Sequence, residues 1–281
     1  MKRVIQTLAL TLVLVALTVA LGAAAFVWSG WYDIAANVQH TQPVHALLEK
    51  TMHQSVRRHA AQIKAPALDA AALVSQGAAC YVAKCVQCHG GPGVAQAEIA
   101  LSMQPLPGPL VDAALRWRPQ ELYLITRNGI KMSGMPAWQH RLPDRALWAL
   151  VAFMQRLPTL SAAEFRRLAV ANPGTPSPCG AAVPTVARTP DAQRGSIALT
   201  QYACNSCHII PGITGSDVHV GPPLAGIARR GLIAGAVPNT FEQMVRWITH
   251  PQSIDPQTTM PTLQVSEQDA RDIAAYLATL D

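Results

Sequence analysis

The sequence predicts an all-α protein: two tandem helical domains behind an N-terminal transmembrane helix and an amphipathic juxtamembrane helix. Three observations support this prediction. The first 28 residues are strongly apolar, a five-residue motif of cysteine and histidine occurs twice, and a stretch with five prolines separates the two copies. A chain of 281 residues has room for two domains of about 100 residues each in addition to the membrane segment.

The N-terminal segment, residues 1–28, has the length and composition of a transmembrane anchor. Lys2 and Arg3 precede an apolar run over residues 4–28. As a helix this run is about 37 Å long, which exceeds the hydrocarbon core of a bilayer. The two basic residues would stay in the cytoplasm and place the rest of the chain outside. A signal peptide cleaved near the alanines at 23–25 is the alternative. We expect an uncleaved anchor, because the run is long for a signal sequence.

Residues 29–66 are too polar to span a membrane and too few to form a domain. Apolar side chains recur in them at helical spacing, which predicts an amphipathic helix. Basic residues near its end form either a solvated face or a docking surface for anionic lipid or a membrane partner. The apolar positions are Val44, Leu47, Leu48, Met52, Val56 and Ile63, and the basic ones are His53, Arg57, Arg58 and His59.

The repeated motif, Cys-x-x-Cys-His, occupies residues 85–89 and 204–208. It is the attachment pattern of a c-type haem. Its two thiols lie on one face of a helical turn, where both can bond to the vinyl groups of one porphyrin, and the following imidazole can bind the iron. We therefore expect two covalently bound haem c groups, each with one iron. Their binding residues are Cys85, Cys88 and His89 in the first copy and Cys204, Cys207 and His208 in the second.

The two motifs belong to predicted domains with the same order of elements, at residues 67–170 and 193–281. In each, a helix leads into the motif, a Gly/Pro-rich loop follows, and a methionine-bearing loop precedes a closing helix. The first closing helix is expected over residues 144–154, with Asp144 as its N-cap, and the second over 266–276. Between the domains, the prolines of residues 171–192 predict a semi-extended linker.

A methionine followed by proline occurs in each of these loops, at Met135 and Met260. We expect these thioethers to be the sixth ligands of the two irons. Such a ligand favours ferrous iron, raises the reduction potential and closes the iron to small molecules. The competing residues are Met103, Met132 and His140 in the first domain and His219 and His250 in the second. Met103 is better explained as an apolar contact under a Pro-rich loop.

Both domains resemble the class I cytochrome c family, over most of residues 70–160 and 193–281. The second is similar to the cytochrome c domain fused to subunit II of some haem–copper oxidases, through residues 233–239 and 247–251 and the Met260 loop. The first resembles membrane-anchored monohaem cytochromes of bacteria. In the class I cytochrome c family, a glycine of the first helix packs on an aromatic residue of the last helix. The resemblance thus implies the pairs Gly77 with Phe153 and Gly195 with Tyr276.

The resemblance also implies that the carbonyl of Pro222 accepts a hydrogen bond from the ring of His208 and so orients it. Other candidates for contact with haem are Trp247, Thr258, Arg230 and Arg127, for which packing or a surface position is an equal explanation. Cys80 is expected to be a buried, unreactive thiol. A disulfide between Cys80 and Cys179 is the alternative in an oxidising compartment.

Charge is divided unevenly between the domains. Residues 67–157 contain eight Lys and Arg against five Asp and Glu, whereas residues 195–281 contain four against seven. The acidic second domain therefore either has an incidental surface charge, or steers toward a basic partner surface or toward its basic neighbour. Basic residues are scattered along the chain, so its basic pI does not indicate nucleic-acid binding.

The expected function is that of a single-pass dihaem cytochrome of the bacterial inner membrane with its haem domains in the periplasm. It would relay electrons to or from a respiratory complex, with a terminal oxidase favoured, or a soluble redox protein. The alternatives are the electron-accepting subunit of a dehydrogenase and a dihaem enzyme such as a peroxidase or a sulfur-compound oxidase. The enzyme needs an open iron, whereas both domains carry a suitable methionine, so no catalytic residues are expected.

Overall fold

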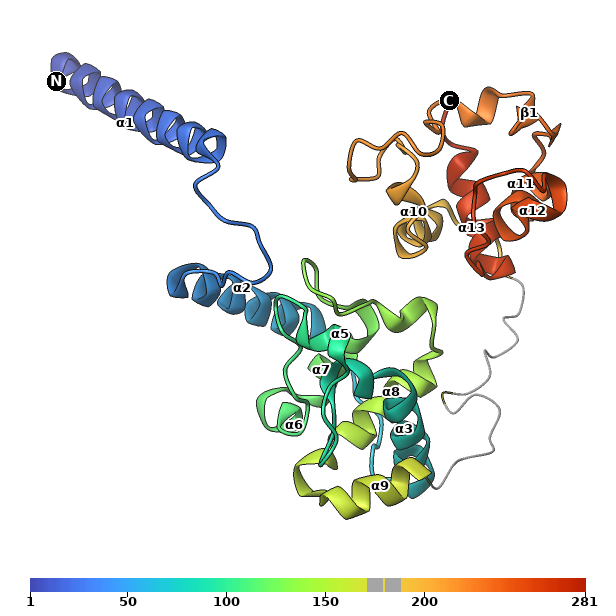
Figure 1. The fold of residues 1–281 in the computed structure, drawn as a ribbon. Coiled ribbons are helices and arrows are strands. Elements are labelled where there is room, and N and C mark those ends of the chain that lie inside the picture. The colour runs from blue at the N-terminus through green and yellow to red at the C-terminus, as the bar shows by residue number, and fades with distance from the viewer. Residues whose placement is uncertain (171–178, 180–187) are drawn as a thin grey trace.

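A computed structural model describes residues 1–170, 179 and 188–281, and Figure 1 shows the course of the chain. The described part is mostly helical, as predicted. It also contains a two-residue antiparallel strand pair, β1 (Leu232–Ile233) with β2 (Val237–Pro238), which was not predicted. Positive φ angles at Ala234 (51°) and Gly235 (73°) close this small hairpin.

Helix α1 (Lys2–Ser29) is the predicted N-terminal apolar helix. None of its 28 residues is buried, and it lies apart from the other helices in Figure 1. The helix ends at Gly30, which takes the left-handed conformation (φ 64°) common at helix C-termini. Within the described residues it is the one helix long and apolar enough to cross a membrane.

Helix α2 (Gln42–Ala60) is the predicted amphipathic helix, and its C-terminal half packs on the first domain. Ala60 is 1% exposed, and the ring of His53 stacks on that of Trp117 with centroids 4.2 Å apart. Leu47 and Leu48, in the N-terminal half, are exposed. Because one end of the helix is held by packing, α2 moves with the first domain.

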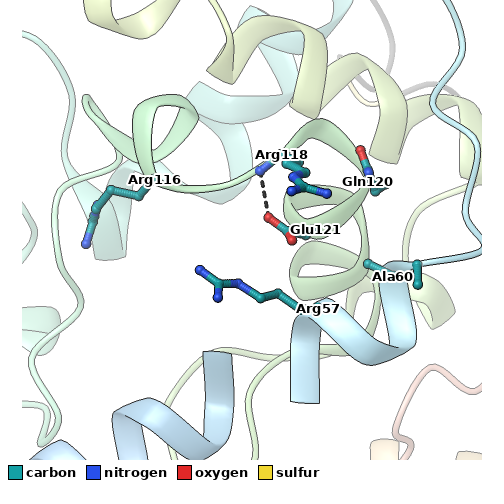
Figure 2. Close-up of a pocket in the computed structure, with 7 residues that line it drawn as sticks. Arg57, Ala60, Arg116, Arg118, Gln120 and Glu121 are labelled. Carbon is teal, nitrogen blue, oxygen red and sulfur yellow. Dashed lines mark hydrogen bonds between the residues drawn. The ribbon is translucent and has the colours of Figure 1, made fainter. Parts of the chain in front are cut away.

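A positively charged pocket of about 320 Å³ lies where α2 meets α7 (Pro119–Asn128). Figure 2 shows the guanidinium groups of Arg57, Arg116 and Arg118 around it. The carboxylate that lines it, Glu121, is buried and accepts a hydrogen bond from the backbone N–H of Arg118 at 2.8 Å, as a cap of α7. Arg57, in the basic end of α2, is exposed and also lines this pocket.

The first domain is built on α3 (Ala71–Lys84) crossing α8 (Asp144–Met154), which Figure 1 shows side by side. Gly77 lies at the crossing. A Cβ on this residue would be 1.9 Å from the carbonyl oxygen of Ala149 and 2.8 Å from the Cβ of Phe153. The predicted packing of Gly77 on Phe153 is therefore confirmed, and Gly77 permits contact between the two backbones.

Helix α9 (Ala162–Val170), which was not predicted, covers this crossing with Phe165. The Phe165 ring meets Tyr81 edge-on at 6.1 Å and lies 6.2 Å from Phe153, and all three are fully buried. The other helical segments of the first domain are short: α4 (Val86–His89), α5 (Glu98–Leu101), α6 (Ala113–Arg116), η1 (Trp138–His140) and η2 (Leu157–Thr159).

The second domain repeats this crossing with α10 (Ala192–Gln201) and α13 (Glu267–Leu277). A Cβ on Gly195 would lie 2.0 Å from the carbonyl oxygen of Asp272. The predicted Gly195–Tyr276 contact is thus corrected: the glycine meets the backbone one turn earlier, and the Tyr276 hydroxyl donates to the carbonyl of Pro211 at 2.7 Å. The remaining elements are η3 (Cys204–Ser206), η4 (Ile227–Arg229), α11 (Phe241–Thr249) and α12 (Pro251–Ile254).

A buried carboxylate also joins α10 to α13. The side chain of Asp272 is 1% exposed and accepts from Arg194 Nε at 2.9 Å and from the backbone N–H of Asp191 at 2.8 Å. Since both of its oxygens are paired, the charge is compensated within the domain. This ion pair sits at the same crossing as Gly195 and fixes the register of the two helices.

A disulfide joins Cys80 of α3 to Cys179. Both residues are buried, at 0% and 2% exposure. The expectation of a free Cys80 thiol was wrong and the alternative disulfide is confirmed. Most of the predicted linker, residues 171–178 and 180–187, lies outside the described residues, so its conformation remains a prediction.

We predict that Gly195→Ala destabilises the second domain by about 1–3 kcal/mol, because the new methyl group overlaps the backbone of α13. Hydrogen exchange in α10 and α13 would measure the loss, with α3 and α8 as an internal reference. Gly231→Ala is the matched control. A Cβ there meets nothing within 4 Å, so a change below about 0.5 kcal/mol is expected. Equal effects of both variants would contradict the packing argument.

Candidate haem-binding sites

The first motif lies in a single helical turn directly after α3. Cys85 ends α3, and Cys88 and His89 belong to α4, with the His89 N–H bonded to the Cys85 carbonyl at 2.8 Å. This turn places both thiols and the imidazole on one local surface. Neither thiol is used in a disulfide. The geometry is therefore what attachment of one porphyrin through two cysteines requires.

The ring of His89 is oriented by a backbone carbonyl. Its Nδ1 lies 2.7 Å from the oxygen of Gly108, and since a carbonyl can only accept, Nδ1 carries the proton and Nε2 has a free lone pair. Burial lowers the pKa of His89, and the hydrogen bond to Gly108 partly opposes this. The neutral ring that results is the form that binds iron. The sequence argument missed Gly108, although its place in the Pro-rich loop after the motif matches that of Pro222 in the second domain.

The second motif forms a comparable turn around η3. The His208 N–H bonds the Cys204 carbonyl at 3.0 Å, and the thiols of Cys204 and Cys207 are free. The predicted hydrogen bond is present, with His208 Nδ1 lying 2.8 Å from the carbonyl oxygen of Pro222. A Cβ on Gly221 would lie 2.3 Å from Cε1 of His208. Glycine is therefore needed at 221 for the loop to approach the imidazole this closely.

Met135 lies in a loop that starts at Gly129. This glycine has a φ of 68°, and a Cβ on it would be 2.6 Å from the carbonyl oxygen of Met135. The same carbonyl accepts the N–H of Ile130 at 3.2 Å, which closes the loop. Met135 is half-buried. The loop thus has a defined backbone that presents one thioether.

The competing residues in the first domain are placed differently. Met132 is 91% exposed, and Met103 packs with its sulfur against Gly134, in agreement with its expected role as an apolar contact. The side chain of His140 lies outside the described part of the chain. In the second domain His250 is exposed, and His219, also exposed, pairs with Asp217 at 3.5 Å.

The Met260 loop is organised by Thr258, whose hydroxyl oxygen accepts the Met260 N–H at 3.3 Å. Arg230 donates to the carbonyls of Pro223 and Ala225 at 2.6 and 3.1 Å. Its guanidinium therefore supports the loop that carries Pro222. Trp247 is 8% exposed within the core of the second domain, and Arg127 donates to Asn128 at 2.9 Å.

The donor atoms of each site fit a covalently attached haem. Each domain offers two free thiols in one turn, an imidazole whose Nδ1 is held by a carbonyl, and a thioether in a separate loop. Bound there, haem supplies an iron that can carry one electron. The protein supplies the ring orientation and an apolar core on which the macrocycle can lie.

Each domain is similar to a known protein family. Residues 72–154 match the family model described as cytochrome c oxidase, cbb3-type, subunit III, and residues 192–281 match the cytochrome c family model. A 90-residue part of the chain is 33% identical to cytochrome c oxidase subunit 2 of Alkalihalophilus pseudofirmus. This match covers 32% of the chain and 25% of that relative. No solved structure matches the chain.

The fold and these matches define the class of protein: the chain is an electron-transfer cytochrome with covalently bound haem c. More particularly, residues 72–154 are similar to the cbb3-type subunit III family, and residues 192–281 are similar to the cytochrome c family.

We predict that Gly221→Ala removes the low-spin absorption of one haem, because the new methyl group overlaps the ring of His208 and displaces it. Haem absorption per polypeptide and the spin state of the purified protein would measure this. Gly108→Ala is the matched control, since Gly108 also holds a proximal ring but a Cβ there meets nothing within 4 Å. Loss of a low-spin haem in both variants would contradict the steric explanation.

Proposed function

We propose that this protein is a membrane-anchored dihaem cytochrome that relays electrons on the periplasmic side to a respiratory complex, with a terminal oxidase as the acceptor. The observation that carries the proposal is that the chain has two oxidase-related matches, residues 72–154 to a cbb3-type subunit III family and a 90-residue part to an oxidase subunit 2. Helix α1 would be the single inner-membrane span, with Lys2 and Arg3 on the cytoplasmic side.

In this proposal residues 67–170 and 193–281 are tandem class I cytochrome c domains, joined by the linker 171–192 and preceded by the segments 1–28 and 29–66. One haem is attached at Cys85 and Cys88 with His89 and Met135 as axial ligands. The other is attached at Cys204 and Cys207 with His208 and Met260. The carbonyls of Gly108 and Pro222 orient the proximal rings.

In this proposal these residues occupy the two axial coordination positions of each iron and leave none for a substrate. With an imidazole on one side and a thioether on the other, each iron has six ligands and no position for peroxide or a sulfur compound. An electron then enters and leaves through the haem edge, without a bond to iron being made or broken. This arrangement favours a carrier over the dihaem enzyme considered from the sequence.

We predict that Met135→Ala and Met260→Ala each remove about half of the sulfur-to-iron charge-transfer absorption of the ferric protein, because each leaves one haem without its thioether. The reduced variants should also bind carbon monoxide at one iron, whereas the wild-type protein should not. Met132→Ala is the matched control, since this neighbouring side chain is 91% exposed. A full band in Met135→Ala, or its loss in Met132→Ala, would contradict the assignment.

We predict that the solubilised full-length protein copurifies with a terminal oxidase and that its reduced haems are oxidised by oxygen only when this oxidase is present. The two oxidase-related matches of the chain are the reason. Affinity purification from membranes, followed by a stopped-flow measurement with and without cyanide, tests both parts. Copurification with a dehydrogenase whose substrate reduces the haems would overturn the oxidase assignment in favour of an electron-accepting subunit.

A further inference from the structure

A cation–π pair joins described residues of the two domains. The guanidinium carbon of Arg141 lies 4.5 Å from the ring centroid of Tyr202, in cation–π geometry. Tyr202 is 4% exposed, and its hydroxyl donates to Asp269 of α13 at 2.8 Å. The ring is thereby held in position with one face toward Arg141, and the carboxylate of Asp269 adds negative charge behind it.

This contact lies between the two candidate haem sites along the chain. Arg141 follows Met135 by six residues, at the end of η1, and Tyr202 precedes Cys204 by two residues, at the end of α10. The contact thus links the loop of one proposed axial methionine to the attachment turn of the other haem.

The charges of the domains favour the same contact. Residues 67–157 have a surplus of three basic residues and residues 195–281 a surplus of three acidic ones, from eight against five and four against seven. Burial raises the pKa of Tyr202, and so does Asp269, while Arg141 lowers it. The tyrosine therefore stays neutral and able to donate its hydrogen bond.

The disulfide limits how far the domains can separate. Cys179 is fixed to α3 through Cys80, and Arg188 is fixed to the second domain by the hydrogen bond from its N–H to Gln268 at 2.9 Å. These points are nine residues apart in the chain, a reach of at most about 30 Å. Without the disulfide, the last residue packed in the first domain before the second is Leu168. Leu168 is 20 residues from Arg188, and a fully extended chain of that length spans about 65 Å.

The shorter connection matters because the contact itself is small. Among the described elements no helix of one domain packs extensively on a helix of the other. A single cation–π pair between an exposed arginine and a tyrosine is weak, so it forms only when the local concentration of the partner domain is high. A short covalent connection gives each domain an effective concentration on the order of millimolar near the other. Shortening this connection from 20 to nine residues raises the effective concentration by about threefold.

We propose that the two haem domains dock reversibly on each other through Arg141 and Tyr202, with the Cys80–Cys179 disulfide as the device that keeps them within reach. The docked state is the one in which an electron passes between the haems. One electron leaves a ferrous iron and reduces the ferric iron of the other haem, and no bond or proton changes. The inference rests on the proposed function only in that both domains carry a low-spin haem.

The first test compares Arg141→Ala with Arg145→Ala in the detergent-solubilised full-length holoprotein. Arg145 is a matched control because it is an exposed arginine four residues away, outside the contact with Tyr202. Pulsed EPR would measure the distance distribution between the ferric haems, and pulse radiolysis the rate of electron equilibration between them. Arg141→Ala should lower the docked population and the rate by about two- to fivefold, and Arg145→Ala should leave both unchanged.

The second test removes the disulfide with Cys179→Ser, which should lower the docked population by about threefold while leaving both haem spectra intact. Wild-type distances and rates in both Arg141→Ala and Cys179→Ser would overturn the proposal. Failure of the oxidase assay, together with a slower interhaem rate in Arg141→Ala, would refute the proposed partner and leave this inference standing.

Discussion

The close crossing of the first and last helices is the constraint on which each domain depends. At Gly77 and Gly195 the facing backbone oxygen lies where a Cβ would be, at 1.9 and 2.0 Å, so no other residue permits the same approach. The crossing brings together parts of the chain about 75 residues apart in sequence (positions 77 and 149–153, and 195 and 272). It leaves the intervening loops to surround a flat cofactor, with the attachment turn fixed at the end of the first helix. Both domains contain this crossing, although they share a pattern and little residue identity.

Orientation of the imidazole that we propose as the proximal ligand is the second common requirement, and the two domains meet it with different residues. The carbonyl is that of Gly108 in the first domain and of Pro222 in the second. What is shared is a backbone oxygen at 2.7–2.8 Å from Nδ1, since any residue can supply a carbonyl. The supports also differ: Arg230 holds the second loop through the carbonyls of Pro223 and Ala225, while Gln96 donates to the carbonyls of Cys88 and Pro107 beside the first.

The elements predicted correctly from the sequence are those that depend on local pattern. The apolar run, the two motifs and the closing helices carry their information within a few residues, and the structure contains α1, both motif turns and α8 and α13. The predicted N-cap of α8 was wrong: Pro143 holds that position, and Asp144, the first helical residue, accepts a hydrogen bond from the Tyr123 hydroxyl at 2.7 Å. The features that were missed, or were given only as an alternative, depend on residues distant in sequence. The Cys80–Cys179 bond joins positions 99 residues apart, the contact partner of Gly195 is set by helix register, and Gly108 acts through a backbone atom that no side-chain pattern reveals.

A relay needs its two redox centres to meet and also needs each to reach a different partner. A large interface between the domains would satisfy the first need and prevent the second, because it would bury the surfaces around the haem edges. A contact of one arginine with one tyrosine, combined with a short covalent connection, makes a docked state that is populated but easily left. Helix α2 restricts the movement of the first domain. Because α2 packs on this domain through Ala60 and His53, the first domain moves with the juxtamembrane segment. The second domain, joined to the first by residues 171–192 and the Arg141–Tyr202 contact, is in this proposal the one that exchanges electrons with a partner at a distance from the anchor.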